Sequence, residues 1–330
     1  MVRNASWLIL LFLAVHALAW QLQFPQAEIS NKSIRATLYL PDSDTGYYRG
    51  TRFDWSGVIA SLCYQGHNFF GQWFENYSPK KHDAISGPVE EFVSEDGGLG
   101  YAAAKAGGMF IKIGVGVLRK IDDQEYKFTR NFQLVNPGRR IIRPEKDRVD
   151  FVHELNDGEG YAYVYRKTVR LLGNKPILVL DHRLKNTGRK AIETSVYDHD
   201  FFRIDGQTSG PDFVVRFPFR PVPANNMNGF AEIHGNELTY LQQLRKGQSI
   251  STDIAGFSQS VQDNDIRVEN RRLGVGVREV GDHPLSRLYF WSIATTVCPE
   301  AYIDLKITPG HEAHWRITYY FYALPAAEMY

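Results

Sequence analysis

Apolar and polar residues alternate with a period of two over much of the middle of the chain. The pattern is clearest at residues 161–165 and 191–197, and between them residues 177–180 form an apolar run of the kind found in buried strands. A period of two is typical of strands that bury one face. Residues 173–176 and 186–189, which lie between these segments, contain the Gly, Asn and Pro residues that form tight turns. The sequence therefore predicts three consecutive antiparallel strands, a meander that ends at His199.

Strand-like segments continue to the carboxyl end, whereas helical periodicity is weak. Further strands are expected at residues 213–219, 288–296, 303–307 and 315–322, and the best helical candidate is a short one at residues 238–245. Chains of many short strands bury their apolar faces by packing one sheet on another. We therefore expect an all-β fold, a large antiparallel β-sandwich.

The first residues have the pattern of a secretory signal peptide. Arg3 supplies a positive start, residues 7–15 an apolar core, and Ala-Leu-Ala at residues 17–19 a cleavage site. The apolar core is shorter than the about 20 residues of a membrane-spanning helix, and no later segment reaches that length. We predict a signal peptide at residues 1–19, a single domain at 20–330, a secreted or periplasmic location and no membrane span in the mature chain.

The charged residues are nearly balanced. The chain has 38 Lys and Arg against 37 Asp and Glu, a formal net charge of +1, and loss of Arg3 with the signal peptide brings it to 0. Proteins that bind nucleic acid carry a basic patch or stripe, and none stands out in this sequence. We therefore expect no nucleic-acid partner and a neutral substrate or one small anion, with the oligomeric state left open.

The two cysteines, Cys63 and Cys298, have apolar or aromatic neighbours. A chain of this length can bury a core without covalent cross-links. We expect both to be small buried residues with a structural role, and the sequence leaves open whether they form a disulfide.

The strongest chemical signal is the segment 198–202, Asp-His-Asp-Phe-Phe, at the end of the predicted meander. A histidine between two carboxylates and ahead of two aromatic residues is typical of an acid/base site that handles sugars. If the strand continues past His199, Asp198 and Asp200 lie on its opposite face, and if it ends there they lie nearby. A close carboxylate would raise the pKa of His199 and keep it protonated.

A second candidate region combines aromatic residues with hydrogen-bonding groups. Residues 46–57 and 66–75 are rich in glycine, which suggests loops on a β scaffold. Sugars present an apolar face and a rim of hydroxyl groups, so Trp73 with His67, Arg49 and Arg52 would make a sugar receptor. The alternative is a packed aromatic core with its polar residues in solvent.

The two arginines of this region have two possible roles. Arg49 and Arg52 could clamp a phosphate or a uronate through paired hydrogen bonds. They could equally pair with nearby carboxylates at positions 42, 44 and 54.

Taken in order, these features resemble the galactose mutarotase-like superfamily, which includes aldose 1-epimerases and hexose-6-phosphate mutarotases. The resemblance spans about residues 160–322. Three features carry it: the strands of residues 163–185 with their turn at 184–188, the segment 198–202, which is similar to the family's Asn-His-Thr-Tyr-Phe type motif, and Cys-Pro-Glu at 298–300 followed by the Pro-Gly turn at 309–310.

The resemblance implies a mutarotase-like supersandwich and an exported aldose 1-epimerase-like enzyme. Glu300 would be the base that takes the proton from the anomeric hydroxyl, and His199 the acid that protonates the ring oxygen. The ring would then reclose on either face with the roles reversed. Arg49, Arg52, His67, Trp73 and Asp200 are the candidate substrate-binding residues, and no metal or organic cofactor is needed.

The residue types and their neighbours also bear on these roles. Glu300 stands in an otherwise apolar stretch, where an unpaired buried carboxylate is costly, so a functional role is favoured. His311 and His314 have a spacing that would suit a metal on a helix, but they follow a turn into a strand, so we expect them to face solvent.

Two alternatives remain open at this stage. One is a noncatalytic protein that binds sugar or oligosaccharide. The other is a glycan lyase or hydrolase on a related sandwich, and a hydrolase would need a carboxylate pair about 5 to 10 Å apart.

Overall fold

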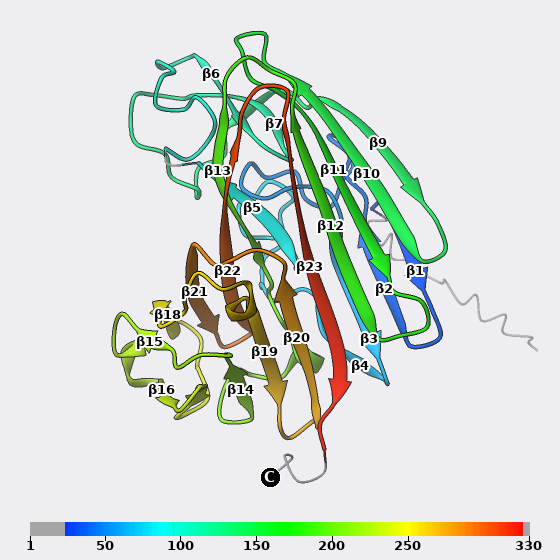
Figure 1. The fold of residues 1–330 in the computed structure, drawn as a ribbon, viewed down its shortest axis with the longest axis vertical. Coiled ribbons are helices and arrows are strands. Elements are labelled where there is room, and N and C mark those ends of the chain that lie inside the picture. The colour runs from blue at the N-terminus through cyan, green and yellow to red at the C-terminus, as the bar shows by residue number, and fades with distance from the viewer. Residues whose placement is uncertain (1–23, 95, 326–330) are drawn as a thin grey trace, which may run out of the picture.

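Nearly all of the regular structure is β-strand in the computed structural model, which describes residues 24–94 and 96–325 (Figure 1). Three single-turn 3-10 helices interrupt the strands: η1 (Ile204–Gly206), η2 (Met227–Gly229) and η3 (Val261–Asp263). The strands are β1 (Gln26–Ser30), β2 (Ile34–Tyr39), β3 (Val58–Tyr64), β4 (His67–Asn68), β5 (Val89–Val93), β6 (Met109–Lys112), β7 (Gly116–Arg119), β8 (Gln133–Asn136), β9 (Arg139–Pro144), β10 (Arg148–Asn156), β11 (Ala162–Leu171), β12 (Ile177–Asn186), β13 (Ile192–His199), β14 (Phe213–Arg216), β15 (Val222–Pro223), β16 (Ala231–His234), β17 (Glu237–Tyr240), β18 (Ser249–Ala255), β19 (Asp265–Asn270), β20 (Val275–Gly281), β21 (Arg287–Ile293), β22 (Thr296–Ile307) and β23 (Glu312–Ala323).

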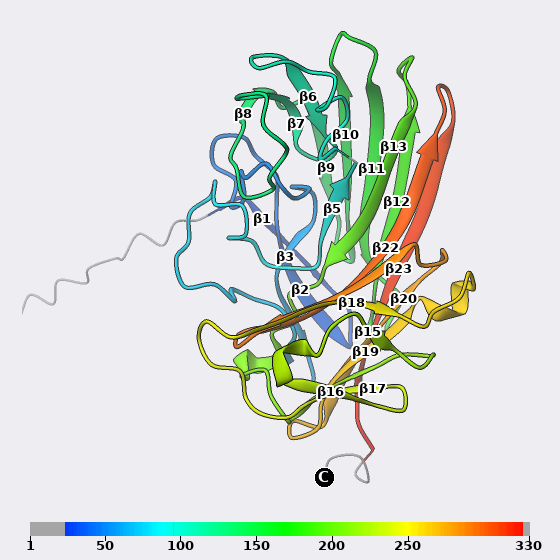
Figure 2. The same cartoon turned by 90° about the vertical axis from the view of Figure 1, so that its left-hand side faces the viewer.

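Two large antiparallel sheets form the body of the molecule. The ten-stranded sheet has the order β16-β17-β14-β19-β20-β23-β12-β11-β10-β9, and the six-stranded sheet has the order β15-β18-β21-β22-β13-β5. Smaller sheets of four strands (β1–β4) and three strands (β6–β8) complete the fold. Figures 1 and 2 show β10, β11, β12 and β23 side by side, with β13 and β22 in the neighbouring layer. The predicted all-β antiparallel sandwich is therefore confirmed.

The predicted meander is correct for its first two strands and wrong for the third. β11 and β12 pair as antiparallel neighbours, but the other neighbour of β12 is β23. β13 instead crosses to the six-stranded sheet, where it pairs with β22 and β5. A turn-forming cluster predicts a reversal of the chain but not the sheet that the next strand joins. The expected place of His199, at the end of this strand, is confirmed.

Other local expectations also need correction. The predicted helix at 238–245 is not formed, because Leu238 and Tyr240 belong to β17 and are buried with the strand period of two. The strand expected at 213–219 ends at Arg216, and the one expected at 288–296 is a hairpin that joins β21 to β22.

The interior of the sandwich is filled by side chains from both large sheets. Tyr165 and Trp315 of the ten-stranded sheet share a buried cluster with Val196 and Ile303 of the six-stranded sheet. Two further apolar clusters are present. One includes side chains of the four-stranded sheet, and the other includes side chains of the three-stranded sheet. The apolar core therefore extends across the whole sandwich.

A buried ionic cluster also joins the two sheets. Glu90 of β5 accepts a hydrogen bond from Lys167 of β11, and it contacts Nε2 of His182 of β12 at 2.6 Å. The side chains of Glu90 and Lys167 are fully buried. Burial by itself raises the pKa of Glu90, but the charge of Lys167 and the contact with His182 outweigh it and lower the pKa to about 2. Lys167 also donates to the backbone oxygen of Ser56. The carboxylate is therefore ionised and paired inside the sandwich.

The two cysteines are unpaired, and only one of them is buried. Cys298 lies in the interior of β22, as expected, whereas Cys63 is exposed on β3, so the expectation of two buried residues is wrong for Cys63. Alternation along β3 turns Cys63 away from its buried neighbour Leu62.

The described residues contain no helix long and apolar enough to cross a membrane. The predicted signal peptide, at residues 1–19, lies outside the described residues.

Replacing Lys167 with methionine is expected to destabilise the fold by about 3–5 kcal/mol, because it leaves the charge of Glu90 buried without its main partner. Urea unfolding followed by fluorescence would measure the loss. Arg139→Met is the matched control, since Arg139 pairs with Glu154 at the surface, with side chains 68% and 38% exposed, and such pairs contribute about 0–1 kcal/mol. Equal losses in the two variants would contradict the assigned role of the buried cluster.

Candidate functional site

A cavity of about 1100 Å³ lies on the face of the six-stranded sheet that is turned away from the sandwich interior. The strands contribute to it at alternate positions, as expected when every second side chain points to the same face. The lining side chains on these strands are Glu91 and Val93 of β5, Tyr197 and His199 of β13, Glu300 and Tyr302 of β22, Arg287, Tyr289 and Trp291 of β21, and Ser251 of β18.

The pairing of β13 with β22 places His199 opposite Glu300. Val196 pairs with Ile303. Phe202, six residues after Val196, forms a bridge with Val297, six residues before Ile303. The register is therefore the same at both ends of this segment, and its midpoint falls at His199 and Glu300. Ladder hydrogen bonds are interrupted between the two ends, where the side chains of the site lie.

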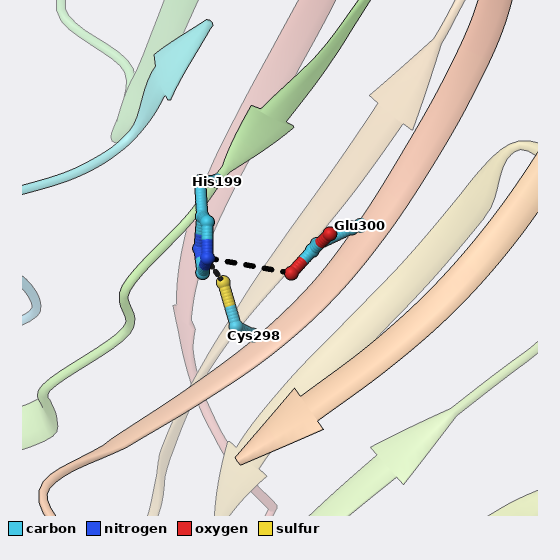
Figure 3. A group of neighbouring side chains, drawn as sticks. All are labelled: His199, Cys298 and Glu300. Atoms are coloured by element: carbon cyan, nitrogen blue, oxygen red, sulfur yellow. Dashed lines mark hydrogen bonds and ion pairs between the residues drawn. The ribbon is translucent and has the colours of Figure 1, made fainter. Parts of the chain in front are cut away.

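Three side chains contact one another at this midpoint (Figure 3). Nδ1 of His199 lies 2.6 Å from Sγ of Cys298, and Nε2 lies 3.4 Å from Oε1 of Glu300. Cys298 and Glu300 are two residues apart on β22, so both point to the same face of the strand. Because Nδ1 is engaged by the thiol, Nε2 is the ring nitrogen that can act on a molecule in the cavity.

The imidazole of His199 is fixed by a stack of aromatic rings. It lies parallel to the ring of Phe201 at a centroid distance of 3.7 Å, and Phe201 stacks in turn on Trp73 at 4.7 Å. Phe201 adopts a φ of +46°, a left-handed conformation that costs an L-residue about 1–2 kcal/mol. Its backbone N–H donates to Sγ of Cys298 at 3.2 Å. These contacts hold the strained residue and orient the histidine.

Burial changes the protonation of both catalytic candidates, whose side chains are each only 5% exposed. Removal from water lowers the pKa of His199 well below its usual value, and the charge of Arg52 lowers it further. Removal from water raises the pKa of Glu300 to about 8, although Arg52 and the hydroxyl of Tyr302 oppose this shift. Near neutral pH the pair therefore carries one proton, on Glu300. The expected protonated His199 is wrong for the free site.

Arg52 lies beside this pair but is not free to bind an anion. Its Nε donates to Oε2 of Glu91 at 2.6 Å, and a terminal nitrogen donates to the hydroxyl of Tyr197 at 3.1 Å. The Tyr197 hydroxyl in turn donates to Glu91 at 2.6 Å. The guanidinium group is thus neutralised within the site, which favours a paired role over a phosphate clamp. Its partner is Glu91 and not one of the expected carboxylates at positions 42, 44 and 54.

Four of the seven predicted site residues line the cavity: His199, Glu300, Arg52 and Trp73. Arg49 and His67 lie elsewhere. A terminal nitrogen of Arg49 donates to the backbone oxygen of Asp44, and His67 Nδ1 contacts Oδ2 of Asp205 at 2.6 Å in a partly exposed pair.

Asp200, the remaining predicted site residue, lies in the interior of the sandwich. Tyr319 of β23 contacts both Asp198 and Asp200, at 2.8 and 2.9 Å from its hydroxyl oxygen. One phenol has a single proton to donate, so one of the two contacts needs a protonated carboxyl. In agreement, burial raises the pKa of both carboxyls well above the usual range, and Glu90 and Glu279 raise it further. Neither residue raises the pKa of His199, which corrects the expected role of Asp200.

Several cavity residues were not identified from the sequence: Glu91, Tyr197, Trp291, Tyr302 and the hydrogen-bonding role of Cys298. Three of them carry a signal that a stricter use of strand alternation could have found. Tyr197 lies two residues before His199, and Cys298 and Tyr302 lie two residues on either side of Glu300. Glu91 and Trp291 come from other strands, and their approach depends on the sheet order.

The donor atoms around His199 and Cys298 are not arranged around a common point, as a metal site requires. His199, Cys298 and Glu300 offer ligand atoms within 4.8 Å of one another, but the thiol and the carboxyl contact different ring nitrogens, so the donors do not converge on one point. His311 and His314 are exposed, as expected, and have separate contacts with Thr308 and Asp181.

Comparison with known proteins identifies the fold. No family model matches the chain, and no curated protein matches it in sequence. Solved structures do match over almost the whole chain. A galactose mutarotase related enzyme from Lactobacillus acidophilus is 13% identical with a TM-score of 0.54, covering 91% of this chain and 98% of that one.

Two further structures give the same result. A galactose mutarotase-like protein from Clostridium acetobutylicum is 10% identical with a TM-score of 0.55, covering 90% and 95% of the two chains. An aldose epimerase homologue from C. elegans is 12% identical with a TM-score of 0.52, covering 91% and 99%. The chain therefore has the galactose mutarotase-like fold.

Replacing Cys298 with alanine is expected to change the environment of His199 Nδ1, because the ring loses its contact with the thiol at that nitrogen. We expect a shifted Nδ1 resonance in ¹⁵N NMR and a loss of about 1–3 kcal/mol in unfolding free energy, the cost of leaving a buried polar atom unsatisfied. Cys298→Ser, which keeps a hydrogen-bonding group, should recover much of both. An unchanged Nδ1 resonance in the alanine variant would show that the thiol does not orient the ring.

Proposed function

We propose that this protein is a carbohydrate mutarotase of the aldose 1-epimerase type, with His199 and Glu300 as its acid/base pair. The observation that carries the proposal is the approach of His199 Nε2 to Glu300 Oε1, at 3.4 Å, on the buried side of a large cavity. The fold supports it, since structures with the same fold include a galactose mutarotase related enzyme and an aldose epimerase homologue.

The geometry suits the proton transfers of ring opening. The anomeric hydroxyl and the ring oxygen are both bonded to carbon 1, so a base and an acid that serve them need lie only a few ångströms apart. In the free site His199 is neutral and Glu300 carries the proton. We infer that Nε2 takes the hydroxyl proton while Glu300 gives its proton to the ring oxygen, as the bond from carbon 1 to that oxygen breaks and an aldehyde forms.

Ring closure returns both protons. After rotation about the bond between carbons 1 and 2, protonated His199 donates to the aldehyde oxygen and ionised Glu300 takes the proton from the attacking hydroxyl. The family resemblance pairs Glu300 with the anomeric hydroxyl and His199 with the ring oxygen. Here each residue serves the other oxygen, because the proton of the free site lies on Glu300. The sequence of steps starts from the state that burial favours, and it needs no group that the chain does not supply.

The aromatic residues of the cavity suit a sugar. Trp73, Trp291 and Tyr302 present flat apolar surfaces near the acid/base pair, and the ring of Tyr302 stacks on Tyr197 at 4.1 Å. Sugar rings pack their C–H faces on such surfaces. A noncatalytic sugar-binding protein would use the same surfaces, so turnover is the property that separates the two functions.

The structure favours a mutarotase over a glycan hydrolase. Asp198 and Asp200, which could have formed a carboxylate pair with Glu300, face the sandwich interior and contact Tyr319. Glu91 is the other lining carboxyl group on the strands of the sheet, and it is held by Arg52 and Tyr197. The further lining carboxyl groups, Asp83, Asp96, Asp123 and Glu125, belong to loops. We also propose that the protein is exported, because residues 1–19 have the pattern of a signal peptide. Amino-terminal sequencing of the exported protein tests this, and the sequence should begin at residue 20.

Polarimetry of freshly dissolved α-glucose and α-galactose tests the function. The protein should accelerate mutarotation, and Glu300→Gln should reduce kcat by about 10²–10⁴, the usual contribution of a general acid or base. Asp304→Asn is the matched control, because Asp304 lies on the same strand but faces solvent. Sugar binding without acceleration by the wild type would instead support the noncatalytic function.

The pH dependence of kcat/KM follows from the two pKa shifts. Above about pH 8 Glu300 loses its proton and the pair lacks an acid. Below the pKa of His199, which lies under 6.5, both groups are protonated and the pair lacks a base. We therefore expect a bell-shaped profile whose alkaline limb falls near pH 8, after subtraction of the spontaneous rate. Activity that keeps rising well above pH 8 would contradict a pair that shares one proton.

A further inference from the structure

The cavity is much larger than the sugar unit that the acid/base pair can act on. It encloses about 1100 Å³. A hexose has roughly 12 non-hydrogen atoms, and even at a water molecule's share of about 30 Å³ for each atom it fills no more than about 360 Å³. A single sugar at His199 and Glu300 would leave most of the cavity to solvent.

The chemistry dictates how a longer sugar would lie. Ring opening needs a free anomeric hydroxyl, so only the reducing-end unit of an oligosaccharide can react. That unit must sit at His199 and Glu300, and the remaining units must extend from it into the rest of the cavity. The pair lies at the buried side, which places the rest of the chain toward the solvent side.

The outer part of the cavity is built for such units. It is lined by residues of two loops. Those before β6 are Ser94, Asp96, Gly97, Tyr101 and Ala102, and those in the connection between β7 and β8 are Lys120, Asp123, Gln124, Glu125, Tyr126, Phe128 and Thr129. Within that connection Phe128 is 45% exposed and Tyr126 is partly exposed, and both line the cavity. Tyr126 is held by stacking on Phe132 at 5.6 Å. Exposed aromatic rings that border a cavity are the surfaces on which sugar rings pack.

The charges in the cavity exclude an anionic glycan. Six carboxyl groups line it against three cationic side chains; the carboxyl groups are Asp83, Glu91, Asp96, Asp123, Glu125 and Glu300. Each cation already has a partner: Arg52 contacts Glu91 and Arg287 contacts Asp253, both at 2.6 Å, while Lys120 donates to two backbone oxygens. A uronate or phosphate would therefore meet net negative charge and no uncommitted cation among the three.

We propose that the site takes a neutral oligosaccharide of two or more units, with the reducing-end unit at His199 and Glu300 and the following units against Tyr126 and Phe128. This proposal rests on the proposed function for its reactive unit. It adds a second subsite and a substrate class that the fold alone does not specify.

Catalysed mutarotation along sugar series of increasing length tests the proposal. Two series start from glucose: one continues with maltose and maltotriose, and the other with cellobiose and cellotriose. Three further pairs are galactose with β-1,4-galactobiose, mannose with β-1,4-mannobiose, and N-acetylglucosamine with chitobiose. We expect kcat/KM to rise about tenfold or more from one to two or three units in one series, which corresponds to roughly 1.4 kcal/mol of added binding. Digalacturonate should show no gain over galacturonate.

Phe128→Ala links the gain to the outer subsite. It should reduce the ratio of the oligosaccharide to the monosaccharide kcat/KM toward one. Leu241→Ala, which removes an exposed apolar side chain outside the cavity, should leave the ratio as in the wild type. A ratio that Phe128→Ala does not change would overturn the assignment of the second subsite.

The outcomes separate this proposal from the proposed function. Equal kcat/KM at all lengths, or a gain restricted to digalacturonate, would overturn the oligosaccharide site and leave the mutarotase intact. If no sugar is turned over, the mutarotase fails, and calorimetric titration with the same probes decides the second proposal. Affinity that increases with length and is reduced in Phe128→Ala supports it, and affinity independent of length, or no binding, overturns it.

Discussion

The strict alternation of side chains across the six-stranded sheet is the constraint on which the rest of the structure depends. Neighbouring glutamates on β5 show it most clearly. Glu90 points into the sandwich, where it pairs with Lys167, whereas Glu91 points into the cavity, where it pairs with Arg52. β5 thereby connects the two large sheets and positions the guanidinium group of Arg52 beside the acid/base pair. The stability of the sandwich and the geometry of the site are thus set by the same few residues.

The same alternation produces two different acidic environments within one segment of chain. Asp198 faces the sandwich interior, where buried carboxyls share the hydroxyl of Tyr319. His199, the next residue, faces the cavity, where it meets only one carboxyl group, that of Glu300. Both environments are poor in water, so both favour uncharged forms. They differ in that the cavity is open to a ligand, which can exchange protons with the pair.

Much of the fold and the centre of the site could be predicted from the sequence. The period of two in residues 161–197 predicted strands, and the segment around His199 together with an isolated Glu300 indicated an acid/base pair. The sequence could not show that β13 leaves its neighbours for the other sheet, because turn residues determine a reversal and not a partner strand. Asp200 was assigned to the site because it flanks His199 in the sequence, but alternation along the segment turns it into the sandwich interior, against Tyr319. Cys298 was assigned a structural role because its contact with His199 depends on a pairing between residues 99 positions apart.

The pairing register is the same at two points of this segment, where Val196 pairs with Ile303 and Phe202 with Val297. This constant register has an evolutionary consequence. Substitutions in this segment change one side chain at a time, but insertion or deletion of a single residue would invert the whole set. The histidine would turn toward the interior and an aspartate would replace it in the cavity. Relatives of this protein that retain the chemistry should therefore conserve the length of this segment even where they have lost nearly all sequence identity.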